Sequence, residues 1–394
     1  MKNYFTRFLL IVAVVVFVCV CTTACKNDNG LGNGVFGNDP EYDYGFEYVL
    51  SSDGNYYILA NVGRCTDANI VIPSKHDGKP VRVIGRAAFQ NCDFLQSVTI
   101  SSGIVTIEFA AFENCTGLKE LSVPNTVEEI YGNAFNNCGK DIFTIENYHV
   151  YVGNKSNPYY ALVSMEPSGK ETSSNGYYEY NVYPMTCSPH NDTVLIAVDA
   201  LRKGTDTRNL HLGESVKYIT YGALLSNYVE HIYVAQKNYN YLTIGNVLYS
   251  RDRQTLIQYF TVYNTNNSET EFQVFDFVTN LAPGAFYDAR RLETVILPEG
   301  MVEISPSAFA GCYNLEQIVI PKSMKKISLC AFYGASTYMK ILYCGTAEEF
   351  DAMEIDDFND PFLESYVYFY SEGKPLERGN FWHYSKDGKP VIWD

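Results

Sequence analysis

Cysteine is the residue type whose number and spacing first suggest chemistry in this chain. The sequence contains 11 cysteines against only 6 histidines. Three cysteines lie within the first 25 residues, and four of the others each follow a phenylalanine by three positions. These four are Cys92, Cys115, Cys138 and Cys312. If the protein is exported, such thiols could pair as disulfides, because stacked repeats would bring neighbouring ones near bonding distance.

A column of small buried residues, one from each repeat, explains the spacing of these cysteines without any disulfide. The equivalent positions in sister repeats hold Gly204, Asn227, Ala289 and Ala335. A position that accepts alanine so readily is typical of packing, where cysteine behaves as a small hydrophobic residue. We therefore expect a buried column, and the sequence leaves open whether Cys92, Cys115 and Cys138 are free thiols or disulfides.

The sequence shows none of the usual motifs of a metal site, a cofactor site or a catalytic site. The histidines show no metalloprotease pair, and the cysteines after residue 25 contain no Cys-x-x-Cys pair, so neither pattern predicts zinc. The sequence has no phosphate-binding loop and no Gly-x-Ser-x-Gly motif. The acidic segment 348–360 lacks the spacing of a calcium loop and is expected to be a solvated surface. We predict no catalytic residue, no metal ligand and no cofactor.

The N-terminus has the pattern of an export signal. Lys2 and Arg7 precede an uncharged apolar run over residues 8–20, which is short for a membrane span. Thr22-Thr23-Ala24 before Cys25 is similar to a bacterial lipobox, although the family pattern prefers an aliphatic residue at position 22. We expect residues 1–24 to be a lipoprotein signal peptide and Cys25 to carry a lipid anchor to the membrane. Ordinary cleavage with secretion, or an uncleaved anchor, remain alternatives, and all three place the body outside the cytoplasm.

The charge balance limits the possible partners. Asp and Glu number 45 and Lys and Arg 29, for a net charge of −16. Nucleic-acid binders cluster basic residues, so this composition argues against nucleic acid. Tyrosine is abundant, with 33 copies, which suits recognition surfaces but also fills β-rich cores.

An internal repeat determines the expected fold. An Ala-Phe pair recurs every 23 residues in two blocks, and two degenerate Ala-Leu pairs keep the same spacing. The pairs begin at Ala88, Ala111, Ala134, Ala200, Ala223, Ala285, Ala308 and Ala331. We call one such 23-residue unit a rung. One rung cannot bury its own apolar side, whereas stacked rungs bury a continuous core.

A strand is expected six residues after each phenylalanine. Segments such as LQSVTI (95–100) and LEQIVI (315–320) are short and β-branched, which favours a strand over a helix. Proline often ends the segment, because it lacks the N–H that a ladder needs. A Val/Met-x-x-Ile step then follows. The expected fold is therefore a repeat solenoid, mostly β with short helical turns, two non-repeat interruptions and a C-terminal cap.

These motifs resemble the BspA-type leucine-rich repeat surface proteins of bacteria. Their repeat is roughly Leu-x-x-Val-x-Ile-Pro-x-x-Val-x-x-Ile-Gly-x-x-Ala-Phe-x-x-Cys, and the resemblance covers about residues 45–394. It implies a solenoid used for binding at the cell surface, and it brings no catalytic residues with it.

The organisation along the chain follows from where the repeat holds. A flexible tether is expected at 25–44, an N-terminal cap and repeat block at 45–145, and degenerate rungs at 188–235. Interruptions are expected at 146–187 and 236–275, a last repeat block at 276–345, and a C-terminal cap at 346–394.

The outward positions of the repeat strands are the candidate binding residues. Alternate side chains of a strand point away from the core, so the third and fifth residues of Leu-x-x-Val-x-Ile should form a surface. The predicted binding residues on this outward face are Glu120, His211, His231, Tyr233, Ile296, Gln317 and Val319. The face carries no single-sign charge stripe, which suits a broad protein or glycan partner of unknown identity.

The sequence thus predicts a non-enzymatic cell-surface binding or adhesion protein, exported and held by a lipid on the outer face of a membrane. A structural spacer of the cell envelope without a specific ligand is the first alternative. A hydrolase hidden in the interruptions is the second, and it would require an essential Asp or Glu with a strongly raised pKa.

Overall fold

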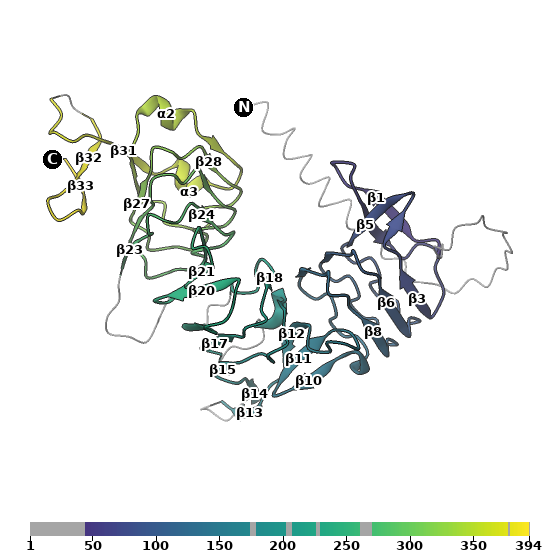
Figure 1. Cartoon of the computed structure of the whole chain (residues 1–394). Helices are drawn as coiled ribbons and strands as arrows, with labels where there is room; N and C mark the ends of the chain where they lie inside the picture. The colour runs from purple at the N-terminus through teal and green to yellow at the C-terminus, as the bar shows by residue number, and fades with distance from the viewer. Residues whose placement is uncertain are drawn as a thin grey trace.

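The computed structural model describes residues 44–173, 179–201, 207–225, 229–260, 270–376 and 379–393. Within these ranges the chain is a mostly β solenoid with little helix, as predicted (Figure 1). The N-terminal rungs form one column, the C-terminal rungs form a second, and the middle rungs join the two (Figure 1).

The Leu-x-x-Val-x-Ile segments form the predicted strands and pair in parallel, in register, one rung apart. The N-terminal ladder contains β3 (Asn69–Ile72), β6 (Ser97–Ile100) and β8 (Glu120–Ser122). The middle ladder contains β15 (Thr186–Cys187), β17 (Asn209–Leu212) and β19 (His231–Val234). The C-terminal ladder contains β23 (Glu271–Gln273), β25 (Thr294–Ile296), β27 (Gln317–Ile320), β29 (Lys340–Tyr343) and β31 (Tyr366–Tyr370).

The Val/Met-x-x-Ile step gives each rung a second, shorter strand. In the N-terminal block these strands are β5 (Lys79–Ile84), β7 (Thr106–Ile107) and β9 (Glu129–Ile130). In the C-terminal block they are β24 (Asn280–Leu281), β26 (Glu303–Ile304), β28 (Lys326–Ile327) and β30 (Glu354–Ile355). Two ladders on different sides of the coil enclose the apolar core.

The Ala-Phe turn forms the remaining wall of the coil, and its phenylalanines stack from rung to rung. The ring centroids of Phe89 and Phe112 lie 5.1 Å apart with nearly parallel planes, and those of Phe286 and Phe309 lie 4.9 Å apart. All four rings are fully buried. Aromatic stacking therefore adds to the hydrophobic burial that holds neighbouring rungs together.

Asparagine stabilises the tight backbone after each phenylalanine in the N-terminal block. Asn91, Asn114 and Asn137, each two residues after the phenylalanine, have φ of 64°, 63° and 54°, a left-handed conformation that Asn tolerates better than most residues. Their amides form a ladder, in which Asn114 donates to Asn91 over 2.8 Å and Asn137 donates to Asn114 over 2.9 Å. Gly311 and Gly334 occupy the same position in the C-terminal block.

The cysteines of the repeat form the expected buried column, in which Cys115 and Cys138 are free thiols. Cys92 and Cys115 are fully buried and Cys138 is partly buried. The Cys115 and Cys138 thiols each donate to a phenylalanine carbonyl of the preceding rung, over 3.1 and 3.0 Å. The neighbouring Cys138 thiol and burial raise the pKa of the Cys115 thiol, which makes it unreactive.

The interruptions continue the solenoid with antiparallel strands. In the first, β10 (Thr144–Glu146), β11 (His149–Val152) and β12 (Ala161–Met165) pair in order. Strand β12 then pairs in parallel with β16 (Leu195–Ile196), which continues to β18 (Tyr218–Ile219). The second interruption contains three antiparallel strands, β20 (Tyr241–Ile244), β21 (Val247–Ser250) and β22 (Thr255–Tyr259). Strand β22 then pairs in parallel with β24. Each interruption thus replaces part of a rung rather than only protruding from it.

A separate ribbon and a contact between blocks complete the middle of the molecule. Strands β13 (Gly169–Thr172) and β14 (Glu179–Val182) form a two-stranded ribbon below the middle rungs (Figure 1). The Thr220 hydroxyl, just after β18, accepts a hydrogen bond of 3.1 Å from the Ile130 backbone of the N-terminal block. The short 3₁₀ turns η1 (Lys140–Ile142) and η2 (Val198–Ala200) also lie in this region of the chain.

A Ser-x-Asp sequence closes three of the hairpins. Ser51, Ser250 and Ser385 each donate their hydroxyl to an aspartate two residues later over 2.6 to 2.7 Å. The three aspartates are Asp53, Asp252 and Asp387. The serine hydroxyl holds the pKa of each carboxyl below its ordinary range, at about 2 for Asp53.

Both ends of the solenoid are capped. At the N-terminal end, β1 (Glu47–Leu50) and β2 (Tyr57–Asn61) form a hairpin that joins β5, and β4 (Lys75–His76) folds back on β5. At the C-terminal end, α2 (Ala347–Asp351) and α3 (Asp360–Leu363) close the core. Phe362 of α3 stacks on Phe332 at 5.0 Å and so ends the phenylalanine column. The last hairpin consists of β32 (Phe381–Tyr384) and β33 (Pro390–Ile392).

Candidate binding surface

The three repeat-strand ladders present outward faces of different chemistry. The N-terminal face carries small polar residues such as Ser97 and Thr99, together with the predicted Glu120, which is exposed. Glu120 belongs to a different sheet from the other predicted residues, in the opposite column from the C-terminal rungs (Figure 1). The structure therefore does not bring Glu120 together with them.

The C-terminal face is covered, which corrects the prediction for two residues. Ile296 is 6% exposed and Val319 is fully buried, so neither is part of an outward surface. They form a separate apolar cluster with Leu342 and Trp382 on the side of β25, β27 and β29 that faces away from the solenoid core. Gln317, at the edge of the same face, is partly exposed.

The C-terminal hairpin provides this cover. The Trp382 indole donates to the Tyr343 carbonyl over 3.0 Å, and its ring is fully buried. Near the turn of the hairpin, Lys389 pairs with Glu271 of β23 over 3.6 Å. Figure 1 shows β32 and β33 on the outer side of the column that carries β27. The strand pattern correctly predicted that Ile296 and Val319 point away from the solenoid core. However, a segment more than 60 residues later in the chain packs on them.

The middle face leaves an aromatic pair exposed. His211 of β17 and Tyr233 of β19 are directly paired across the ladder, with ring centroids 4.7 Å apart and planes inclined by 32°. His211 is exposed and the Tyr233 side chain is 50% exposed. His231 lies opposite Asn209 on the same face and is partly exposed. The structure thus brings together three of the predicted residues, His211, His231 and Tyr233.

Polar groups extend this middle face to β15. The Asn209 amide donates to the exposed Thr186 hydroxyl over 3.4 Å, which links β17 to β15. At the edge of the face, Arg208 and the buried Glu230 form an ion pair of 2.6 Å between the starts of β17 and β19. We call Thr186, Asn209, His211, His231 and Tyr233 the middle face; it contains no Asp, Glu, Lys or Arg side chain.

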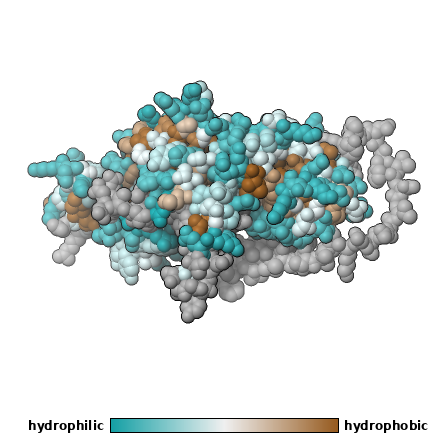
Figure 2. Space-filling model, turned by 90° about the horizontal axis from the view of Figure 1, so that it is seen from below, coloured by the Kyte–Doolittle hydropathy of each residue, from teal (hydrophilic) through white to brown (hydrophobic). Residues whose placement is uncertain are grey.

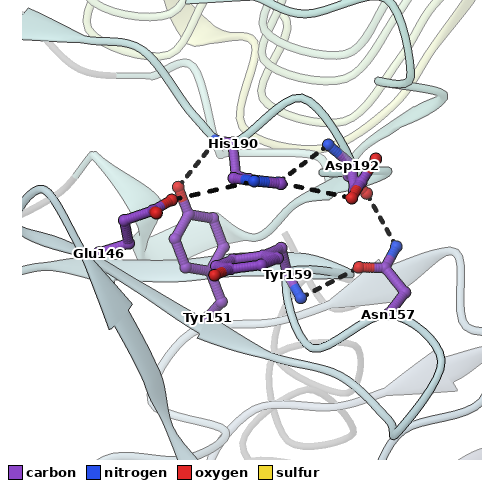
Figure 3. A network of polar contacts seen from close by, with 6 residues as sticks. All are labelled: Glu146, Tyr151, Asn157, Tyr159, His190 and Asp192. Carbon is purple, nitrogen blue, oxygen red and sulfur yellow. Dashed lines mark hydrogen bonds and ion pairs between the residues drawn. The ribbon is translucent and has the colours of Figure 1, made fainter.

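A polar network that the sequence reasoning missed holds β15 in place (Figure 3). The His190 imidazole, three residues after β15, stacks on the Tyr159 ring at 3.8 Å, and the His190 backbone donates to the Tyr151 hydroxyl over 2.9 Å. Glu146 and Asp192 lie on the two sides of the imidazole, with nitrogen–oxygen distances of 4.0 and 3.8 Å. The network fastens the segment that follows β15 to Tyr151 of β11 and to Tyr159.

A buried histidine lies beside this network. His149 of β11 is 4% exposed, and neither ring nitrogen reaches a hydrogen-bond partner of good geometry. Burial lowers the pKa of His149, and polar backbone groups of Glu146 and Asn147 offset only part of that shift. Burial therefore favours the neutral form of this imidazole.

Several exposed aromatic side chains were also not singled out from the sequence. Tyr313 is 55% exposed, with the Arg290 guanidinium 5.3 Å above its ring, and Tyr338 is 83% exposed. Figure 2, viewed from below, shows a mostly hydrophilic surface with separate hydrophobic areas. Exposure of single aromatic residues has no sequence signal, because the repeat pattern fixes only the buried positions.

Among the residues that the structure describes, no group of three or more His, Cys, Asp or Glu side chains is placed to hold a metal ion. In the acidic C-terminal segment, Glu354 and Asp356 instead pair with Lys326 over 2.9 and 3.3 Å. No helix within the described ranges is long and apolar enough to cross a membrane. The predicted signal peptide and Cys25 lie outside the described residues.

The comparison with protein families agrees with this architecture. The model of the BspA type leucine rich repeat region matches six copies, over residues 82–175 and 255–353. The chain therefore contains BspA-type leucine-rich repeats over these residues. No curated protein sequence matches the chain.

Solved structures of bacterial leucine-rich repeat proteins are similar to the chain at low sequence identity. The pneumococcal vaccine antigen PcpA is 18% identical, with 83% of this chain and 92% of that chain covered and a TM-score of 0.37. A leucine-rich cell surface protein from Faecalibacterium prausnitzii is 21% identical over 80% of this chain and 97% of its own, with a TM-score of 0.33. A leucine-rich repeat protein from Eubacterium ventriosum is 18% identical over 82% of each chain, with a TM-score of 0.37.

Proposed function

We propose that this protein is a non-enzymatic binding protein of the bacterial cell surface that recognises an extracellular protein or glycan through its solenoid. The family consists of surface proteins, and an extended repeat surface suits recognition better than catalysis. The apolar run at 8–20 and the small residues before Cys25 support export with a lipid anchor at Cys25.

One observation carries the proposal: the chain covers one outward strand face and leaves the aromatic one open. The apolar residues of the C-terminal face lie beneath Trp382, whereas Tyr233 and His211 remain exposed on the middle face. Exposed aromatic side chains surrounded by neutral polar groups are typical of binding surfaces. A spacer without a ligand would have no use for this difference between the two faces.

An array screen of the full chain, purified in mild detergent, tests the proposal. The array carries matrix proteins, mucins and glycans, and binding is measured at two salt concentrations because the chain has a net charge of −16. We expect saturable binding that the His211→Ala, Tyr233→Ala double variant weakens. Glu120→Ala, on the N-terminal face, is the matched control and should leave binding unchanged.

Each other outcome favours a different function. Binding that the double variant leaves intact would move the recognition site to another surface, such as the exposed Tyr313 and Tyr338. The absence of any binding would favour a structural role in the cell envelope. Turnover of an arrayed glycan or peptide would favour the hydrolase alternative.

The lipid anchor has its own test. In a bacterial host that lipidates exported proteins, the wild-type chain should incorporate a radiolabelled fatty acid and sediment with membranes. Cys25→Ser should lose the label and be released to the soluble fraction, whereas Cys21→Ser should behave as the wild type. Label that persists in Cys25→Ser would contradict lipidation at this residue.

A further inference from the structure

We propose that the middle face, which consists of Thr186, Asn209, His211, His231 and Tyr233, binds a neutral oligosaccharide. The inference rests on the proposed function and narrows its ligand to one chemical class. Three features of this face support it: the exposed aromatic pair, the neutral hydrogen-bonding groups beside that pair, and the small area of the face.

The aromatic pair offers a surface for the apolar side of a sugar ring. A pyranose presents C–H groups on one side, and these pack against an aromatic face that is open to solvent. The Tyr233 ring is 50% exposed and lies 4.7 Å from the imidazole of His211, so the two rings form a continuous patch across β17 and β19. Aromatic rings that are held rigidly lose little conformational freedom on binding.

Hydrogen-bonding side chains lie beside the aromatic pair at the spacing of the ladder. Asn209 and Thr186 follow one another on neighbouring strands, and His231 lies opposite Asn209. Neighbouring strands lie about 4.8 Å apart, which places these groups within reach of hydroxyls on one oligosaccharide. The Asn209 carboxamide and the Thr186 hydroxyl each contain a donor and an acceptor, as a sugar hydroxyl requires.

The charge of the protein selects against acidic glycans. The five side chains of the middle face carry no ammonium or guanidinium group to bind a sulfate or a sialic acid carboxylate. Arg208, at the edge, is already paired with Glu230 over 2.6 Å. The chain as a whole has a net charge of −16, which repels polyanions at low salt.

The size of the face favours a glycan over a protein. Three strands span about 10 Å across, and four residues span about 13 Å along the strand, so the face covers roughly 130 Å². A stable protein interface needs about 800 Å² from each partner. A short oligosaccharide fits the smaller area.

Isothermal titration with defined oligosaccharides tests the inference. The full chain in mild detergent is titrated with neutral hexasaccharides of glucose, mannose and xylose, and with a sulfated heparin hexasaccharide. We expect at least one neutral probe to bind and the sulfated probe not to bind. Tyr233→Ala should weaken binding by about tenfold or more, as loss of a central aromatic contact does. Tyr233→Phe should retain binding, because it keeps the ring.

Two controls separate loss of the site from loss of the fold. Tyr233 and Asn209 are not core residues, so both alanine variants should keep the wild-type thermal midpoint. Asn209→Ala should weaken binding by about threefold to tenfold through lost hydrogen bonds. Tyr338→Ala, which removes a more exposed tyrosine from the C-terminal block, should not change it.

The outcomes distinguish this inference from the broader proposal. Binding of no neutral probe, or neutral binding that Tyr233→Ala leaves unchanged, would overturn the glycan inference. If arrayed proteins nevertheless bind in a Tyr233-dependent way, the proposed binding function stands and only the ligand class is wrong. If neither glycans nor proteins bind, both fail.

Discussion

Replacing Trp382 with alanine should weaken the docking of the C-terminal hairpin and expose more of the apolar face beneath it. Trp382 is fully buried, its indole donates to the Tyr343 carbonyl over 3.0 Å, and it belongs to the cluster of Ile296, Val319 and Leu342. Strand β32 also pairs in parallel with β31, and the Trp393 indole donates to the Ser371 carbonyl over 3.0 Å. The exposed ion pair of Lys389 with Glu271 contributes little, because exposed pairs are screened by water.

The expected effect follows from the burial of the indole. A buried tryptophan removes about 200 Å² from water, which at 25 cal/mol per Å² is an upper estimate of about 5 kcal/mol. Trp→Ala substitutions in cores cost about 3–5 kcal/mol. A loss of about 4 kcal/mol shifts the equilibrium between docked and undocked hairpin roughly 1000-fold. The rungs below do not depend on this contact, so the main unfolding transition should change much less.

Hydrogen exchange of residues 379–393 measures this opening, and tryptophan fluorescence gives a second signal. The chain has only two tryptophans, and both lie in the hairpin. In Trp382→Ala, the emission of Trp393 should move to longer wavelength, and 1-anilinonaphthalene-8-sulfonate should bind the uncovered strands. Lys389→Ala is the control and should leave all three signals near wild type. Unchanged protection of 379–393 in Trp382→Ala would refute the account of the covered face.

Three further predictions concern buried groups of the solenoid. Burial lowers the pKa of His149 in the folded state, so the unfolded chain binds more protons than the folded chain just below pH 6.5. The thermal midpoint should therefore fall as the pH drops through this range. His149→Leu should lose this fall, because leucine does not titrate. Asn359 accepts from the Phe332 backbone and donates to two carbonyls near the C-terminal cap, so Asn359→Ala should reduce the free energy of unfolding by about 2–4 kcal/mol in urea titrations. Burial raises the pKa of the Cys312 thiol to about 12, so iodoacetamide should alkylate it about 1000-fold more slowly in the native protein than in urea.

Controls and contrary results follow for each of these. A pH dependence that His149→Leu leaves unchanged would assign the acid sensitivity to other groups. Asn314→Ala removes an exposed amide contact and should cost less than about 1 kcal/mol, so an equal effect at the two asparagines would contradict the special role of Asn359. Alkylation of Cys312 at the rate of the unfolded chain would show that this position opens readily.

The repeat made most of the fold predictable, because its contacts recur at a fixed distance along the chain. A residue in one rung meets its equivalent 23 positions later, as Gln317 meets Lys340 in parallel strands. The spacing of Ala-Phe and Leu-x-x-Val-x-Ile therefore predicted the ladders, and the accepted substitutions by alanine predicted the buried thiol column. The Asn91, Asn114 and Asn137 ladder has the same period, and that signal could have been found.

The features that the sequence did not predict depend on contacts that do not recur at a fixed spacing along the chain. Trp382 reaches Tyr343 across 39 residues, and His190 reaches Tyr151 across the same separation. The outward positions of Ile296 and Val319 were correctly derived from the strand pattern, but strand pattern does not say what covers a face. For this reason His211, His231 and Tyr233 share an open face, whereas the two aliphatic residues do not.

Hydrogen exchange of the full chain with and without a bound partner tests the central claim most directly. A ligand found in the array screen is added to saturation, and backbone protection is compared along the solenoid. The account predicts added protection at 209–212 and 231–234, the two strands that carry the open aromatic pair, and little change in the hairpin at 379–393. Protection confined to the N-terminal strands 97–100 and 120–122, or to the covered strands 294–296 and 317–320, would contradict it.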